Sequence, residues 1–510
     1  MIILGERPLS LDDVVEIARG AAGSDVARVT LGASARERMR TSRAVIDRAL
    51  AGTEAIYGVN TGFGPLKDAR ISADQLRLLQ LNLLRSHAAG VGASAPREVA
   101  RAMLLLRAAS LARGASGCRP EIVDGLLALL EADVTPLVPL EGSVGASGDL
   151  APLAHLALVL IGEGEAWLGT QRMPAGLALR GAGLQPLTLE AKEGLALING
   201  THLSTALAVL AWADACRVWE GAVGAAALST EVLLGSFRPA RAEVQELRPY
   251  PGALETAKRL LVFSADSALV ASHANCGRVQ DAYSMRCVPQ VLGASWDAID
   301  WVGRQLSIEI ESVSDNPIVV PGTAEIVNAG LFHAQPVGMA ADLLKIAVAE
   351  IASLSERRID RLLDPAKSGL PASLAADPGV ESGYMMAQYT AAALVSENKV
   401  LAHPATVDSI PTGAGIEDHV SMAPIAGRHA RAVVTNAARV VALELLCACG
   451  ALEFRRPLTA GLGSEQLYSA VRRRVQAPEG DRPLSEACET LSRWVLSPEP
   501  SRLFEEVLSS

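Results

Sequence analysis

Residues 429–452 read HARAVVTNAARVVALELLCACGAL, and this stretch decides the fold class. Its apolar residues recur at intervals of three and four, which places them on one face of an α-helix. Segments of this kind and length indicate a mainly α protein, built as a bundle of long, roughly antiparallel helices. Helical patterns also cover residues 10–50, 73–84, 97–111, 120–130, 152–161, 203–233, 296–310 and 337–363.

The composition agrees with packed helices. Half of the 510 residues are hydrophobic but only 4% are aromatic, which is unlike a β-sandwich. In the first helical segment, Ser10 and Asp12 are N-cap candidates and Gly20 is a stop signal.

Loops rich in glycine interrupt the helices in the N-terminal part. Residues 57–64 read YGVNTGFG and residues 140–153 read LEGSVGASGDLAPL, and neither suits a regular helix or strand. Residues 174–186 and 364–383 also read as loops, the first as a short hairpin. We expect a single chain over 1–510, with a loop-rich N-terminal region over about 1–200 and the long-helix bundle and C-terminal helices over 201–510.

Charge and cysteine usage exclude several classes of protein. The net charge is −10 and no extended basic run occurs, so we expect no nucleic-acid partner. The longest uncharged stretch, 194–213, contains Asn, His, Ser and Thr and reads as a buried helix, so no membrane span is expected. The N-terminus lacks a signal-peptide pattern, which predicts a cytoplasmic protein. Seven scattered cysteines without a CxxC pair indicate reduced thiols.

Common cofactor motifs are missing from the sequence. It contains no P-loop, no HExxH, no GxGxxG after a strand and no GxSxG elbow. We therefore expect neither a metal nor a soluble cofactor.

The triplet Ala146-Ser147-Gly148 offers a different chemistry. In a tight turn, the unhindered nitrogen of Gly148 can attack the carbonyl of Ala146 and close a five-membered ring, while the side chain of Ser147 leaves as water. The product, 4-methylideneimidazol-5-one (MIO), is an electrophile that no side chain provides. Small residues are needed because the backbone is compressed. The same triplet also occurs at Ala115-Ser116-Gly117, so three residues alone prove little.

The context separates the two copies. Residues 142–155 read GSVGASGDLAPLAH, which resembles the signature of the histidine and phenylalanine ammonia-lyase family. The resemblance extends in separate blocks from about Tyr57 to about Arg456. It implies a helical homotetramer in which each active site draws on three subunits, with MIO formed autocatalytically from Ala146, Ser147 and Gly148.

The resemblance also implies catalytic roles near the turn. Tyr57 matches the tyrosine proposed to remove the β-proton of the substrate. An ordinary tyrosine, with a pKa of about 10, would need a site that favours phenolate. Asn199, in LINGT, matches an asparagine beside the electrophile and the substrate carboxylate, and Asp149 matches an acid that supports ring formation.

Further matches lie in the block NCGRVQDAYSMRCVPQ, residues 275–290. There Gln280 and Tyr283 match side chains that line the substrate pocket. Arg286 matches the arginine that binds the substrate carboxylate, a task that suits the guanidinium fork. Phe332, in GLFH, matches a phenylalanine of the pocket wall.

Two positions indicate the substrate. Ser86-His87 resembles the pairing of histidine-specific members, and His87 can form a hydrogen bond with an imidazole. Glu417 stands where phenylalanine enzymes carry glutamine, and its carboxylate would be left unpaired by a phenyl ring. The resemblance thus implies conversion of L-histidine to trans-urocanate and ammonia.

Three residues depart from the pattern of the histidine enzymes. His202 replaces a glutamine, Leu331 replaces an asparagine and Ile416 replaces a glutamine. Alternatives therefore stay open: an aminomutase that forms β-histidine, a lyase for a modified histidine or another aryl amino acid, or a helical scaffold without activity.

Overall fold

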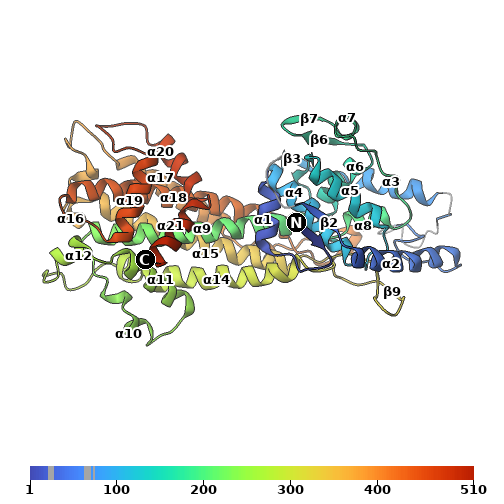
Figure 1. Cartoon of the computed structure of the whole chain (residues 1–510), viewed down its shortest axis with the longest axis horizontal. Coiled ribbons are helices and arrows are strands. Elements are labelled where there is room, and N and C mark those ends of the chain that lie inside the picture. Colours follow the sequence, from blue (N-terminus) through green and yellow to red (C-terminus); the bar gives the residue numbers. More distant parts are fainter. Residues whose placement is uncertain (21–27, 63–70, 73–74, 510) are drawn as a thin grey trace. The chain divides into compact units, whose positions relative to one another are not determined.

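The computed structural model describes residues 1–20, 28–62, 71–72 and 75–509, which form two compact units (Figure 1). Unit 1 comprises Met1–Leu210, Gly303–Asp342 and Pro404–Arg428. Unit 2 comprises the intervening residues and the C-terminal part of the chain. Four of the five boundaries fall inside long helices: α9 (His202–Val232), α14 (Val288–Glu309), α15 (Gln335–Leu363) and α18 (Ala423–Arg455). The fifth lies between His403 and Pro404.

Unit 1 combines helices with small sheets. Its elements are β1 (Ile2–Leu4), α1 (Leu11–Arg19), β2 (Val29–Leu31), α2 (Ala33–Ala51), α3 (Leu76–His87), β3 (Val91–Ser94), α4 (Arg97–Ala112), α5 (Pro120–Glu131), β4 (Val134–Pro136), β5 (Pro139–Glu141), α6 (Leu150–Leu160), β6 (Glu165–Leu168), β7 (Gln171–Pro174), α7 (Ala175–Gly181), α8 (Glu193–Ile198), β8 (Ile318–Val319), β9 (Ile326–Val327), and the 3₁₀ turns η4 (Ala405–Val407) and η5 (Gly413–Gly415).

Helix α4 is the centre of unit 1. Every residue from Val99 to Ala112 is buried, because α1, α2 and α5 all pack against this helix (Figure 1). Helices α3, α6 and α8 contact one another in turn. The strands pair as β1 parallel to β2, and as β3 with β5, β4 with β6 and β7, and β8 with β9, all antiparallel. The core of unit 1 is therefore helical, and its sheets are small additions of two or three strands.

All the named elements among the described residues of unit 2 are helical, and loops connect them. Besides its parts of the four long helices, it contains η2 (Arg238–Ala240), α10 (Ala242–Gln245), α11 (Pro251–Phe263), α12 (Ala268–Ser272), α13 (Tyr283–Arg286), α16 (Pro365–Ser368), η3 (Ala372–Leu374), α17 (Met385–Leu401), α19 (Leu462–Arg474), α20 (Ser485–Val495) and α21 (Glu499–Ser509).

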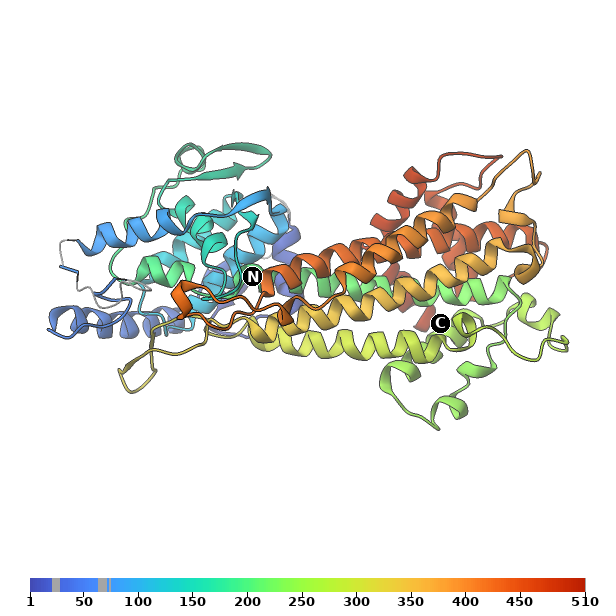
Figure 2. The ribbon, with the colours of Figure 1, turned by 180° about the vertical axis from the view of Figure 1, so that it is seen from behind.

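In unit 2 the long helices lie side by side (Figure 2). The indole of Trp219, on α9, donates to the carbonyl of Leu292, on α14, at 2.9 Å. Arg358, on α15, forms a bidentate ion pair with Glu444, on α18, at 2.5 and 2.8 Å. Both side chains are fully buried. These polar groups of the bundle are thus matched with partners across helices, as burial requires.

The mainly α prediction is confirmed, and the long periodic segments become helices. Residues 203–233 and 337–363 match α9 and α15 closely, and residues 429–452 lie inside α18, which begins earlier, at Ala423. Ser10 caps α1 through a capping box with Asp13, and Gly20 ends that helix. The prediction over 73–84 corresponds to α3, although residues 73–74 lie outside the described residues.

Two local predictions are wrong. The helical pattern over 10–50 is interrupted, because Val29–Leu31 form strand β2 and pair with β1. The hairpin expected within 174–186 lies earlier, as β6 and β7, and residues 175–181 form helix α7 instead. The reason is propensity, since AGLALRG is rich in alanine and leucine, whereas the strands end at Pro174. Residues 364–383 are mainly loop, with the short elements α16 and η3.

Helix α18 is long and apolar enough to cross a membrane, by length and composition alone. However, 83% of its most apolar window is buried. It is therefore a core helix of the protein.

We predict that Glu444→Ala lowers the free energy of unfolding by about 3–5 kcal/mol, because it leaves the guanidinium of Arg358 buried without its carboxylate. Denaturant unfolding measures the change. Glu489→Ala is the matched control. Glu489, on α20, forms a partly exposed ion pair with Arg439, which lies on α18 like Glu444. The control should lose about 1 kcal/mol or less. Equal losses in the two variants would contradict the prediction.

Candidate active site

A cavity of about 850 Å³ opens in unit 1 and contains most of the residues singled out by sequence. All of its lining residues belong to this unit. They are Ala55, Tyr57, Thr61, Leu83, His87, Ala146, Ser147, Leu150, Leu195, Asn199, Asn316, Asn328, Phe332, His333, Ile416, Glu417, Asp418 and His419.

The turn at Gly148 is pressed against a second backbone segment. Gly148 has φ +71°, and it forms an isolated bridge with Gly200. The amide of Asp149 donates to the carbonyl of Gly200 at 2.6 Å. A Cβ on Gly148 would lie 2.2 Å from that carbonyl oxygen. Only glycine fits here, both for its conformation and for its lack of a side chain.

Ser147 is directed toward a carboxylate. Its hydroxyl donates to Oε1 of Glu417 at 3.1 Å, and the hydroxyl of Thr412 donates to Oε2 of the same residue at 2.6 Å. Two hydrogen bonds therefore fix the carboxylate of Glu417 beside the Ala-Ser-Gly turn.

The other Ala-Ser-Gly triplet has different surroundings. Ser116 is 1% exposed, and its hydroxyl has no hydrogen-bond partner among the described residues. The amide of Gly117 donates to Ser42, and the carbonyl of Ala115 accepts from Val319. Neither Ala115, Ser116 nor Gly117 lines the cavity.

His87 ends α3 at the cavity and has a defined protonation pattern. Its Nδ1 lies 2.9 Å from the carbonyl of Leu83, which can only accept, so Nδ1 carries the proton and Nε2 is an acceptor. Burial lowers the pKa of His87 below 6.5, although Leu83 and Glu417 act in the opposite direction. The neutral ring thus presents an acceptor nitrogen. The hydroxyl of the neighbouring Ser86 lies 3.0 Å from Nδ1 of His87, and Ser86 is not among the residues that line the cavity.

Asn199 follows α8 and is 3% exposed. Its Nδ2 donates to the carbonyl of Asn316 at 2.9 Å, whereas its Oδ1 is buried without a partner among the described residues. An unpaired buried acceptor is costly, and here it belongs to a residue of the cavity wall. Asn199 is therefore poised to accept a hydrogen bond.

Asp149 lies beneath the turn and is fully buried. Its carboxylate accepts from the amide and the hydroxyl of Ser204 at 2.8 and 2.9 Å, in the first turn of α9. Burial raises the pKa of Asp149 to about 6, against the effect of these hydrogen bonds. The residue therefore links the turn to the N-terminus of α9.

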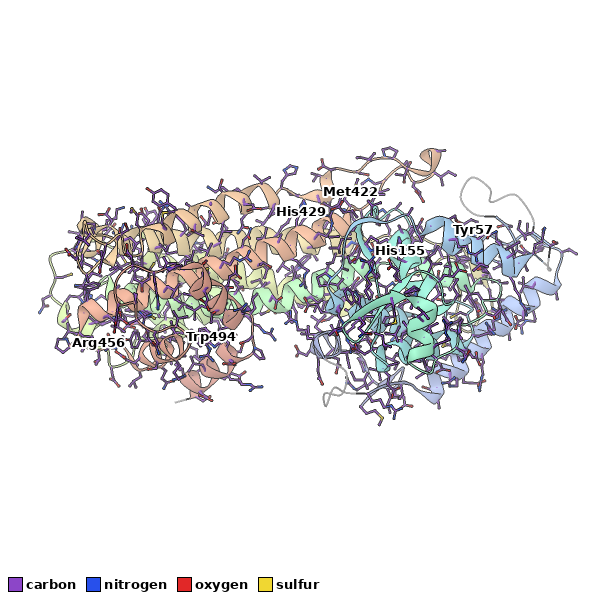
Figure 3. All side chains as sticks on the ribbon, turned by 90° about the horizontal axis from the view of Figure 1, so that it is seen from above. Tyr57, His155, Met422, His429, Arg456 and Trp494 are labelled. Carbon is purple, nitrogen blue, oxygen red and sulfur yellow. The ribbon has the colours of Figure 1, made fainter. Side chains whose placement is uncertain are left out.

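Tyr57 and Phe332 line the same cavity from two further loops. Tyr57 lies in the turn-rich segment after α2, and Figure 3 labels it. Phe63 and Gly64, which end its motif, lie outside the described residues. Phe332 lies shortly before α15.

Gln280, Tyr283 and Arg286 are not part of this lining, because they belong to unit 2. Within that unit, Gln280 and Arg286 line a separate cavity of about 690 Å³. The guanidinium carbon of Arg286 lies 4.7 Å from the ring centroid of Tyr283, which is 69% exposed. Side chains expected at one pocket are thus divided between the units.

Sequence reasoning missed the pair His333 and His419. Their rings stack with centroids 5.8 Å apart, and Nε2 of His333 donates to the carbonyl of His419 at 3.2 Å. The amide of Gln335 donates to Nδ1 of His333. Both histidines occur in motifs that were noted for Phe332 and Glu417, but a contact between distant loops leaves no pattern in sequence.

The three departures lie in different environments. Ile416 lines the cavity and is 56% exposed, so an apolar side chain stands next to Glu417. Leu331 is 47% exposed and is not part of the lining. His202 is buried at the start of α9, where burial and Arg107 lower its pKa well below 6.5.

Comparison with known proteins defines the class to which this fold and site belong. The sequence matches the family described as "Aromatic amino acid lyase" over residues 9–473. The chain therefore belongs to the aromatic amino acid lyase family and is a carbon–nitrogen lyase.

Individual relatives narrow the comparison. A protein of Gloeobacter violaceus named histidine ammonia-lyase is 52% identical over 489 residues, which cover 96% of this chain and 94% of the relative. The crystal structure of histidine ammonia-lyase from Trypanosoma cruzi is 39% identical, with a TM-score of 0.91 and coverage of 99% and 95%. A tyrosine aminomutase from Streptomyces globisporus is 33% identical, with a TM-score of 0.92 and coverage of 99% and 98%.

The raised pKa of Asp149 predicts a pH-dependent stability. An unfolded aspartate has a pKa of about 3.9, so the folded chain binds this proton more tightly. The contribution to stability is then complete below about pH 4 and is lost as the pH rises through about 6. The difference in unfolding free energy between the wild-type chain and Asp149→Asn should fall by about 3 kcal/mol between about pH 4 and about pH 7. Denaturant titrations measure it, and a difference that is constant or grows with pH would contradict this assignment.

Proposed function

We propose that this lyase eliminates ammonia from L-histidine and releases trans-urocanate. The observation that carries the proposal is the carboxylate of Glu417, which is held 3.1 Å from the hydroxyl of Ser147 in a cavity that also contains the neutral ring of His87. The similarity to proteins named histidine ammonia-lyase supports the same substrate.

The residues present fit an MIO group at Ala146-Ser147-Gly148. The nitrogen that must attack belongs to Gly148, where the contact with Gly200 leaves no room for a Cβ. The hydroxyl that must leave belongs to Ser147, which lines the cavity. When formed, the ring supplies an electrophilic carbon that activates the amine of the substrate as a leaving group.

The substrate ring would be recognised by acceptors. The carboxylate of Glu417 and Nε2 of His87 can each accept an N–H from an imidazole. A phenyl ring offers no such donor, so it would cover the carboxylate of Glu417 without replacing the hydrogen bonds of water, which costs free energy. Recognition by these two side chains therefore favours histidine over phenylalanine.

The remaining residues would bind the substrate backbone and move the proton. Tyr57 removes the β-proton, and Arg286 binds the carboxylate through its guanidinium fork. Asn199, with its unpaired Oδ1, is placed to accept a hydrogen bond from the substrate amine. Phe332, Gln280 and Tyr283 complete the walls of the pocket. Asp149 supports ring formation from beneath the turn.

Assembly would bring the two groups of residues together. We propose a homotetramer in which Gln280, Tyr283 and Arg286 of one chain complete the cavity of another, so that each active site draws on three subunits. The exposure of Tyr283 supports this role, since a residue that serves a neighbouring subunit is exposed in a single chain. The protein would act in the cytoplasm on a small amino acid, with no nucleic-acid or membrane partner and no soluble cofactor.

An aminomutase is the second candidate, favoured by the similarity to tyrosine aminomutase at a TM-score of 0.92. It would return the amine to the β-carbon and yield β-histidine. A lyase for a modified histidine or another aryl amino acid is a further alternative, because Ile416 places an apolar side chain at the cavity. Analysis of the products and a panel of substrates separate these activities.

Ultraviolet assays of purified enzyme should show urocanate from histidine, and no arylacrylate from phenylalanine or tyrosine. Glu417→Gln should lower kcat/KM for histidine by about 100-fold, because the charged acceptor for the ring is lost. Asp408→Asn is the matched control, since Asp408 is an exposed acid in the same segment and lies outside the cavity lining. Product from phenylalanine or tyrosine but not from histidine would refute the proposed substrate.

Co-expression tests the shared site. Ser147→Ala lacks the leaving hydroxyl and Arg286→Ala lacks the carboxylate anchor, so each variant alone should be inactive. Mixed tetramers would contain some sites with both residues intact, and activity should reappear when the two variants are produced together. Continued inactivity in verified mixed tetramers would contradict a site shared between subunits.

A further inference from the structure

Arg107 is a buried cation that the proposed function leaves unused. It lies on α4, is 0% exposed, and its Nη1 donates to the carbonyl of Asn199 at 2.7 Å. The same nitrogen lies 3.4 Å from Nδ1 of His202. Its Nε and Nη2 have no hydrogen-bond partner among the described residues.

This arrangement is a poor means of stabilising a fold. A buried guanidinium is costly unless a carboxylate and further acceptors compensate for its lost hydration. Asp315 is the carboxylate whose charge acts most strongly on Arg107, but it already accepts from the ammonium of Lys192 at 2.8 Å. Arg107 therefore directs its one short hydrogen bond to a backbone carbonyl.

The peptide that Arg107 holds is the one against which the reactive turn is set. A Cβ on Gly200 would lie 2.6 Å from Nη1 of Arg107, so the guanidinium is in contact with this residue. The carbonyl of Gly200 accepts from the amide of Asp149, and Gly148 forms its bridge with the same residue. Arg107 and the turn thus contact the segment Asn199-Gly200 together.

We propose that Arg107 is a positioning residue for ring formation: by holding the carbonyl of Asn199 it fixes the segment Asn199-Gly200, and this segment keeps Gly148 in the conformation that closes the ring. The inference rests on the proposed function, because it concerns the formation of the same electrophile.

The reaction that depends on Arg107 balances without an external reagent. One bond forms, between the nitrogen of Gly148 and the carbonyl carbon of Ala146. The carbonyl oxygen leaves as water with the amide hydrogens of Gly148 and Ser147. The hydroxyl of Ser147 leaves as a second water with the hydrogen from its Cα. Neither Arg107 nor His202 is consumed.

The test uses Arg107→Met and Arg107→Lys, with Arg101→Met as the matched control. Arg101 is also a buried arginine of α4 that donates to backbone carbonyls, but these belong to Ile17 and Leu130, and it forms an ion pair with Asp133 at 3.1 Å. Intact mass measures the fraction of chains that lack two waters, and circular dichroism with thermal unfolding shows that each variant is folded. The mass distinguishes the two roles. If Arg107 were merely structural, ring formation in Arg107→Met and in Arg101→Met would fall in proportion to the stability that each variant loses.

We expect complete loss of two waters in the wild-type chain and in Arg101→Met. In Arg107→Met the fraction should fall at least about tenfold, and in Arg107→Lys it should be intermediate, since lysine keeps one donor and the charge. If Arg107→Met does not fold, Arg107→Lys is read in the same way against Arg101→Met.

The inference would be overturned if every folded Arg107 variant lost both waters completely. It would also be overturned if Arg101→Met, at matched stability, formed the ring as poorly as Arg107→Met. A wild-type chain that retains both waters would instead overturn the proposed function itself.

Discussion

Gly148 and Gly200 approach so closely that a side-chain carbon on Gly148 would lie 2.2 Å from the carbonyl oxygen of Gly200. This contact joins the ends of three helices. Helix α6 begins at Leu150, α8 ends at Ile198 and α9 begins at His202. Asp149 reinforces the junction, since its amide binds Gly200 and its carboxylate binds Ser204. This junction fixes part of the cavity wall, because the lining residues Ser147 and Asn199 are the sequence neighbours of Gly148 and Gly200.

Buried charge is used in a similar way in both units. In unit 1, Lys192 and Asp315 form a fully buried ion pair, and the next residue, Asn316, accepts from the side chain of Asn199. In unit 2, the buried Arg358 donates to the carbonyl of Ser284, which lies between Tyr283 and Arg286 on α13. Buried ion pairs contribute less to stability than their number suggests. Here they fix the backbone that carries the site residues.

The sequence predicted those features that a single hydrophobic period or a single motif is sufficient to specify. The long apolar repeats of α9, α15 and α18 predicted helices within a few residues, and the blocks around Tyr57, Ser147 and Glu417 correspond to one cavity. Short or weakly periodic elements escaped prediction, among them α17, whose apolar residues surround nearly its whole circumference. The stacking of His333 on His419 joins loops far apart in the chain, which no local pattern encodes. The division of Arg286 and Ser147 between two units is likewise a property of the fold rather than of either motif.

The most direct measurement is peptide-resolved mass spectrometry of the purified chain. Cleavage after glutamate separates the two Ala-Ser-Gly triplets, because residues 99–121 contain Ala115-Ser116-Gly117 and residues 142–163 contain Ala146-Ser147-Gly148. Only the second triplet has its glycine against Gly200 and its serine at the cavity. The account predicts that peptide 142–163 lacks two waters while peptide 99–121 has its full mass. An unmodified peptide 142–163 from active enzyme would contradict it.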